Sequence, residues 1–199
     1  MIDPYILAEE VLRVVGEAED ASEARLLPGV PREDGVVIAA LAFAVAAAGG
    51  ETAADLGAGA GVSSAWIAYG FSRGCAGREC TLYLVDIDDS VLGVARGFAS
   101  RLSGGLRIEV RVERAASFLK SVDHLDFVFV DVAKECYPQV LESLEDRLTE
   151  RGLVVFHNAL YPPPPREFYE MLESRGWLWA LIPTRLGLLV ARPPRGDAL

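Results

Sequence analysis

Glycines and acidic residues gather where two short apolar runs end. The segment Asp55-Leu56-Gly57-Ala58-Gly59-Ala60-Gly61 closes the first run, and Asp86 closes the second. Glycines at such a turn let a ligand approach the backbone, and the helix that follows offers free N–H groups. The glycines match the first and third positions of a dinucleotide-binding turn but not the sixth, so we expect a ligand without a pyrophosphate. Asp86, at the end of the second strand, is placed to accept hydrogen bonds from the ribose hydroxyls of such a ligand.

Alternating strands and helices are predicted to position these residues. Two amphipathic or apolar helices, Ile6–Glu17 and about 31–48, come first. The predicted strands are Thr52–Leu56, Thr81–Val85, Arg107–Val112, Phe127–Val130, Leu153–Phe156, Trp177–Ile182 and Gly187–Ala191. The predicted helices between them are Ser63–Phe71, Ser90–Leu102, Ala115–Ser121, Tyr137–Thr149 and Arg166–Ser174.

This pattern predicts an α/β protein with a doubly wound, seven-stranded and mostly parallel sheet. The last two strands are joined by only four residues, too few for a helical crossover, so we expect an antiparallel C-terminal hairpin. No repeat or change in composition marks a linker. Residues 1–199 therefore form one domain, with N-terminal helices over 1–50 and a ligand-binding core over 51–192.

Charge and hydropathy exclude several partners. Nineteen Lys and Arg face 29 Asp and Glu, which gives a net charge of −10. We expect such a chain to bind nucleic acid and anionic membranes poorly, because affinity for both comes from clustered Lys and Arg side chains. The longest apolar run, Val36–Ala48, has 13 residues and is too short to span a bilayer. The start lacks the basic region of a signal peptide, so we expect a soluble cytoplasmic protein.

The rarer residue types bear on the growth temperature of the source organism and on whether the cysteines are oxidised. One Asn and one Gln fit a hyperthermophile, while Arg in place of Lys fits a GC-rich genome equally well; we favour the thermophile. Cys75 and Cys80 flank a glycine-containing loop and could pair, as intracellular hyperthermophile proteins permit. We expect two buried thiols instead.

The chain resembles S-adenosylmethionine-dependent methyltransferases with a Rossmann-like fold, on the basis of residues 55–61 and Asp86. It is more narrowly similar to the cation-dependent catechol and caffeoyl-CoA O-methyltransferases. That family has a strand that ends in Asp-x-x-Lys and a next strand that ends in Asp-Asn. Here the corresponding segments end in Asp131-Val132-Ala133-Lys134 and His157-Asn158, and the similarity covers about residues 31–192.

The resemblance implies a cofactor site for S-adenosylmethionine. Residues expected around its methionine part are Asp55, Gly57, Gly59 and Ser63, with Gly61 completing the loop. Asp86 and the adjacent Ile87 are expected at the ribose, and Ala115 and Ala116 at the adenine edge. Relatives often have polar residues at that edge, so we expect adenine to be held here by apolar contact. Asp131 also belongs to this predicted site.

The resemblance further implies catalytic roles for Lys134, Asp131 and His157. Lys134 falls on the position of the base, and Asp131, His157 and Asn158 fall on the metal-ligand positions. Most relatives have Asp where this chain has His157, and an imidazole would favour Mn²⁺, Co²⁺ or Zn²⁺ over Mg²⁺. Three interpretations are open: the metal is retained, the metal is lost, or His157 is itself the base of a metal-free enzyme. We favour a retained metal, because Asp131, Lys134 and Asn158 all remain.

We therefore predict O-methylation of a small acceptor, with phenols as one candidate class. One alternative is methylation of a macromolecular nitrogen, which the net charge and the absence of an Asn-Pro-Pro-Tyr motif disfavour. Another is a non-catalytic cofactor-binding or scaffold protein. Because the helix over Val36–Ala48 is apolar nearly all round, we expect it to be covered by a symmetric partner in a homodimer or to fold over the cofactor.

Overall fold

A seven-stranded sheet forms the centre of the computed structural model, which describes residues 4–194. The strands are β1 (Thr52–Leu56), β2 (Thr81–Asp86), β3 (Arg107–Val112), β4 (Leu125–Val130), β5 (Leu148–Phe156), β6 (Leu178–Ile182) and β7 (Leu188–Arg192). Their order is β3-β2-β1-β4-β5-β7-β6. Strand β7 is antiparallel to β5 and β6, and all other neighbouring pairs are parallel. The predicted sheet and its antiparallel hairpin are confirmed.

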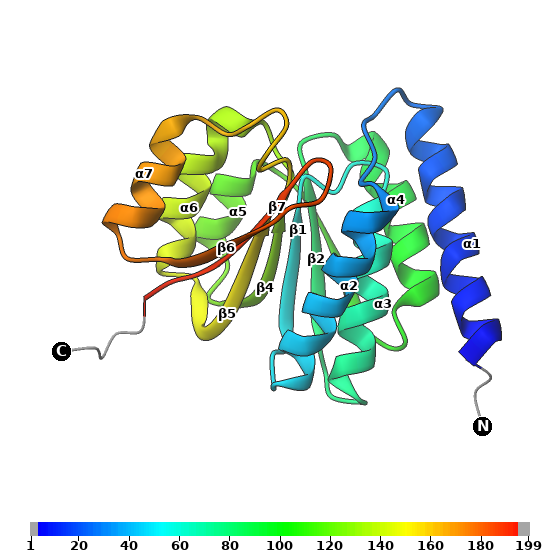
Figure 1. The fold of residues 1–199 in the computed structure, drawn as a ribbon. Helices are drawn as coiled ribbons and strands as arrows, with labels where there is room; N and C mark the ends of the chain where they lie inside the picture. The colour runs from blue at the N-terminus through cyan, green and yellow to red at the C-terminus, as the bar shows by residue number, and fades with distance from the viewer. Residues whose placement is uncertain (1–3, 195–199) are drawn as a thin grey trace.

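Helices cover both faces of the sheet (Figure 1). The first group is α1 (Pro4–Glu23), α2 (Arg32–Ala47), α3 (Val62–Cys75) and α4 (Asp89–Leu102), and α1 packs on α3 and α4. The second group is α5 (Ala115–Ser121), α6 (Tyr137–Glu145) and α7 (Arg166–Ser174). A short 3₁₀ helix, η1 (Lys134–Cys136), precedes α6. Because both faces are covered, the inner strand β4 carries a continuous apolar run, and Phe127 to Val130 are fully buried.

The largest difference from the predicted elements lies between α6 and β5. The amphipathic pattern predicted a helix over Tyr137–Thr149, but α6 ends at Glu145 and β5 begins at Leu148. Leu148 pairs with Leu125 of β4, and the Thr149 hydroxyl donates to Asp126 at 2.8 Å. Pairing with a neighbouring strand therefore overrides the local helical pattern. Helices α1 and α3 are longer than predicted, and no helix within residues 4–194 is long and apolar enough to cross a membrane.

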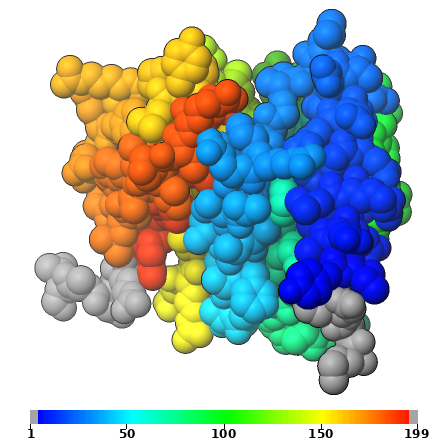
Figure 2. All heavy atoms as spheres, turned by 45° about the vertical axis from the view of Figure 1, so that its right-hand side comes forward, coloured from blue at the N-terminus to red at the C-terminus, as the bar shows by residue number. Residues whose placement is uncertain are grey.

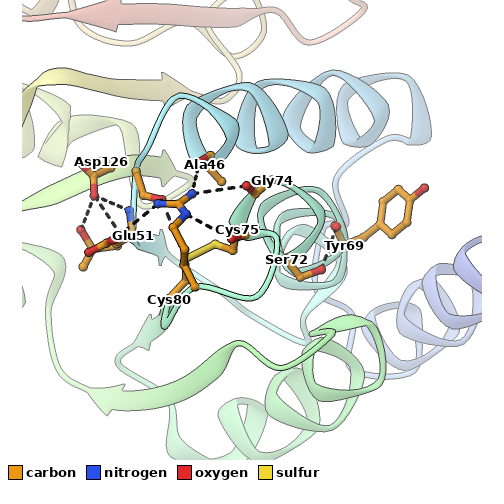
Figure 3. Close-up of a disulfide and its surroundings, with 11 residues drawn as sticks. Ala46, Glu51, Tyr69, Ser72, Gly74, Cys75, Cys80 and Asp126 are labelled. Atoms are coloured by element: carbon orange, nitrogen blue, oxygen red, sulfur yellow. Dashed lines mark hydrogen bonds and ion pairs between the residues drawn. A yellow bond between two sulfur atoms is a disulfide. The ribbon is translucent and has the colours of Figure 1, made fainter.

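A disulfide joins Cys75, at the end of α3, to Cys80, just before β2 (Figure 3). The expectation of two buried thiols was wrong: the turn at residues 76–79 brings the two side chains together. Arg78 lies within this loop and donates to the Ala46, Cys75 and Gly74 carbonyls. These carbonyls belong to the last turns of α2 and α3, so the loop ties the ends of both helices together.

Candidate active site

A cavity of about 590 Å³ lies at the carboxyl ends of the central parallel strands. Its walls include the residues that follow β1, β2, β4 and β5, and the loop between α1 and α2 at residues 27–29. The strand order reverses between β1 and β4. In open α/β sheets ligands bind outside the strand ends at such a reversal, so the fold itself selects this cavity as the candidate site.

The glycine loop forms one wall of the cavity. Gly57 has a φ of 93°, and a β-carbon there would collide with the backbone carbonyl of Asp131. Only glycine therefore lets the end of β1 lie directly against the end of β4. The Gly59 N–H donates to an Asp86 carboxylate oxygen at 2.9 Å. This bond joins the loop to the tip of β2, and the role of Asp86 at a ribose stays a prediction.

The remaining predicted ribose and adenine residues line the same cavity. Ile87, Ala115 and Ala116 stand with Asp86 along the wall formed by β2 and the start of α5. Glu113 and Arg114 also line it, and the sequence analysis did not select them. Both residues come just after β3, at the same edge of the sheet, and this position in the sequence could have identified them.

Three other predicted cofactor residues do not line the cavity: Asp55, Gly61 and Ser63. Asp55 is fully buried and accepts hydrogen bonds from the Ser63 and Ser64 hydroxyls at 2.8 and 2.6 Å. Burial raises the pKa of Asp55 to about 7, although both hydroxyls act to lower it. In this arrangement Asp55 supports the loop from beneath, and its contact with a cofactor stays a prediction.

Lys134 and Asp131 form an ion pair in the same cavity, just after the end of β4. The Lys134 Nζ lies 3.0 Å from an Asp131 carboxylate oxygen and donates to the Tyr137 hydroxyl at 2.8 Å. Burial acts to raise the pKa of Asp131, but the His157 hydrogen bond and the charges of His157 and Lys134 outweigh it and lower that pKa. Burial raises the pKa of Tyr137 well above its usual value, so its hydroxyl keeps its proton. Asp131 is therefore an ionised carboxylate held between two nitrogen donors.

His157 is buried and contacts a carboxylate with each of its ring nitrogens. Nδ1 lies 2.9 Å from Asp131 Oδ2, and Nε2 lies 2.9 Å from Asp34 Oδ2. Asp34, on α2, is fully buried and was not among the predicted site residues. A signal existed: Asp34 shares the buried face of α2 with Ile38, Ala42 and Ala46. A carboxylate on an apolar stripe needs a buried partner.

The predicted metal ligands do not form a cation site in this arrangement. His157 has no free ring nitrogen, and both Asp131 oxygens already accept from a cationic or imidazole nitrogen. The Asn158 side chain donates to the Tyr161 carbonyl at 2.9 Å. Among residues 4–194, no three His, Cys, Asp or Glu side chains are placed to hold a metal ion. The described side chains thus do not fit the divalent cation that the resemblance implied.

The fold and the site together define a doubly wound α/β protein whose glycine loop, strand-tip carboxylate and acid–base cluster line one cavity. A family model described as a methyltransferase domain matches residues 54–159, which is more than half of the chain. The chain therefore belongs to this methyltransferase family. The match spans the glycine loop, Asp86, Asp131 and His157, so it contains the predicted cofactor residues and the acid–base cluster that line the cavity.

Solved structures show the same fold over nearly the whole chain. A methyltransferase from Geobacter sulfurreducens is 21% identical, with a TM-score of 0.76 and 97% of each chain covered. An O-methyltransferase from Bacillus cereus in complex with SAH is 18% identical, with a TM-score of 0.74 and 92% and 91% of the two chains covered. An O-methyltransferase of tomaymycin synthesis from Streptomyces achromogenes, in complex with SAM, is 20% identical, with a TM-score of 0.72 and 90% and 89% covered. No curated protein matches the sequence.

Proposed function

We propose that this methyltransferase uses S-adenosylmethionine to methylate a hydroxyl oxygen of a small acceptor. One observation carries the proposal: the glycine loop, Asp86 and the Asp131–Lys134 pair all line one cavity. A cofactor bound at the glycine loop would lie beside the Asp131–Lys134 pair, so an acceptor held at that pair would be close to its methyl group. Two of the similar structures are named O-methyltransferases and are complexes with SAH or SAM, which supports the same reaction.

In this proposal the residues at the glycine loop, Asp86 and the start of α5 bind the cofactor. S-adenosylmethionine, when bound, supplies a methyl group on a positively charged sulfur. Gly57 and Gly59 let it approach the backbone, Asp86 accepts hydrogen bonds from the ribose, and Ala115 and Ala116 contact the adenine edge. A volume of about 590 Å³ must hold both the cofactor and the acceptor, which favours a small acceptor.

Lys134 is the base of the proposed reaction. Lys134 is charged in its ion pair with Asp131, so it first releases one proton to solvent. The neutral Nζ then takes the proton of the acceptor hydroxyl while the oxygen lone pair forms the new O–CH₃ bond. The methyl–sulfur bond breaks in the same step, and its electron pair stays on sulfur. Asp131 holds Lys134 in position through the 3.0 Å ion pair. The products are the methyl ether, S-adenosylhomocysteine and one proton, so charge and atoms balance.

The two lysines of the chain allow a matched test of this role. Lys134→Met should lower kcat by about 100-fold or more, the usual contribution of a general base, and leave S-adenosylhomocysteine affinity within about threefold. Lys120→Met makes the same change on an exposed position of α5 and should behave as wild type. Turnover is measured with labelled S-adenosylmethionine and a panel of phenols, and affinity by calorimetry. Equal turnover of both variants contradicts the role of Lys134, and absence of S-adenosylhomocysteine binding to the wild type contradicts the function.

We also propose that two copies associate through the outer face of α2. This helix packs one side on α3 and leaves Val36 and Phe43 about half exposed, at 51% and 47%. In the space-filling view α2 lies at the surface between the N-terminal helix and the C-terminal hairpin (Figure 2). An apolar helix face of this kind favours burial against a second copy, because twofold dimers are the commonest assembly.

A further inference from the structure

Lys134 is held by a second side chain besides Asp131. Its Nζ donates to the Tyr137 hydroxyl at 2.8 Å and lies 4.8 Å from the centre of the Tyr137 ring. Tyr137 is fully buried and does not line the cavity, whereas Lys134 does. Because Tyr137 does not reach a cofactor or an acceptor in this cavity, it can influence the reaction only through Lys134.

The spacing of the two residues explains their contact. Lys134 begins the 3₁₀ helix η1, and Tyr137 follows three residues later as the first residue of α6. The backbone N–H of Tyr137 donates to the Lys134 carbonyl and closes this turn. Side chains three residues apart in a 3₁₀ turn lie one above the other. The turn therefore places the amino group of Lys134 against the Tyr137 side chain, within the range of a cation–π contact.

The Tyr137 side chain is itself fixed in position. Its ring packs against Phe156 and Phe168, with ring centres 5.1 and 5.6 Å away. Its hydroxyl donates its one proton to the His157 carbonyl at 2.8 Å, so its lone pairs are left to accept from Lys134. That carbonyl belongs to the residue after β5, and Lys134 lies in the segment after β4. The hydroxyl therefore fixes Lys134 relative to the ends of both strands.

We propose that Tyr137 is a positioning residue, which holds Lys134 in place for the methyl transfer. The inference rests on the proposed function, because Lys134 is the base of that reaction. A long lysine side chain has many rotamers, and holding it in one of them costs conformational entropy. Asp131 and Tyr137 meet this cost when the protein folds, so the Nζ of Lys134 is in place before an acceptor binds. Displacement of a catalytic group by about 1 Å can lower the rate by about 100-fold.

Tyr137→Phe tests the hydroxyl, because phenylalanine keeps the ring and its aromatic contacts. The variant should lower kcat at least about tenfold, with the KM for S-adenosylmethionine and the affinity for S-adenosylhomocysteine within about threefold. Tyr169→Phe is the matched control, since the Tyr169 hydroxyl donates to the Ala159 carbonyl at 2.6 Å instead of contacting Lys134. The control should keep kcat within about twofold. Equal loss of kcat in the two variants overturns the inference.

A double variant separates positioning from support of the fold. In a Lys134→Met background, Tyr137→Phe should lower turnover by less than about a further twofold, because residues that act as one unit give non-additive losses. A purely structural role of the hydroxyl would give the same loss with and without Lys134. Additive losses therefore overturn the inference.

The mobility of the lysine side chains gives a readout that needs no turnover. The chain has only two lysines, so ¹³C relaxation of the lysine Cε groups compares Lys134 directly with the exposed Lys120. In the wild type, both free and with S-adenosylhomocysteine, Lys134 should be the more rigid of the two. Tyr137→Phe should shift the order parameter of Lys134 toward that of Lys120, and Tyr169→Phe should leave it unchanged.

The outcomes of this measurement are distinct from a failure of the proposed function. Equal mobility of Lys134 and Lys120 in the wild type, which needs no variant to fold, overturns the inference. Unchanged mobility of Lys134 in Tyr137→Phe overturns it as well. Absence of S-adenosylhomocysteine binding to a wild type whose Lys134 is rigid, and is loosened by Tyr137→Phe, instead overturns the proposed function alone.

Discussion

The buried carboxyl of Asp55, at the start of the glycine loop, makes the free energy of unfolding depend on pH. Burial raises its pKa to about 7 from an ordinary value of 3.8, against the hydrogen bonds of Ser64 and Ser63, and the charges of Asp131 and Asp86 add to the rise. Between these two pH values the folded protein keeps a proton that the unfolded chain has released. The free energy of unfolding therefore falls as pH rises from about 4 to about 7, by on the order of 4 kcal/mol in all.

Asp55→Asn should remove this fall, because an amide does not ionise. Relative to the wild type, the variant should be more stable at about pH 8 than at about pH 5, measured as the free energy of unfolding in urea. Asp123→Asn, at an exposed position, is the matched control for the same chemical change. If wild type and Asp55→Asn follow parallel pH curves, Asp55 is ionised in the folded state.

Single residues differ in how well the sequence predicts them. Asp131, Lys134 and His157 were predicted from the family resemblance, whose motifs stand at the ends of two apolar strands, and the ends of parallel strands meet at one edge of a sheet. Asp34 was not predicted, because its partner is 123 residues away and no strand end precedes it. The arrangement of the His157 ring depends on that missing partner, so the sequence left the choice between metal, base and neither open.

Helices α2 and α3 approach each other through glycine. A β-carbon on Gly70 of α3 would collide with the backbone carbonyl of Ala39 in α2, and backbone cannot give way as a flexible side chain can. Gly70→Ala should therefore lower the free energy of unfolding by about 1–3 kcal/mol, as overpacking does. Gly93→Ala is the matched control in α4, where nothing lies within 4 Å of the new atom.

The control should behave in the opposite way. Alanine at an exposed helical position reduces the freedom of the unfolded chain, so Gly93→Ala should raise stability by about 0.5–1 kcal/mol. Urea unfolding of the three proteins measures both effects. Equal stability of Gly70→Ala and wild type would mean that α2 shifts away from α3 at no cost.

At the scale of elements, periodicity predicted the existence and type of every described helix and strand apart from the short η1. It failed at boundaries that depend on distant partners. The amphipathic pattern of α6 continues past Glu145. The next residues nevertheless belong to β5, because Leu148 pairs with Leu125 of β4 and the Thr149 hydroxyl donates to Asp126. The disulfide likewise depends on how tightly residues 76–79 turn, which the spacing of two cysteines does not fix.

For the whole molecule, the type of sheet follows from general rules rather than from any local signal. Crossovers between parallel strands are right-handed as a rule, so the alternation and the short last connection predicted the doubly wound sheet and its closing hairpin, while the strand order comes from the structure. The net charge of −10 is also a property of the whole chain. It opposes the approach of a second copy at long range and is screened by salt.

Self-association through α2 should therefore strengthen as salt is added. Sedimentation equilibrium at about 50 mM and about 500 mM salt should give a larger dimer fraction at the higher concentration. Phe43→Glu places a charge on the outer face of α2 and should shift the protein to monomer at both concentrations, because burying an unpaired carboxylate is costly. Val112→Glu makes a similar change at a 52% exposed position on the edge strand β3 and should leave the dimer intact. A wild type that is monomeric at both salt concentrations, or equal dissociation of the two variants, would show that the outer face of α2 is not the contact.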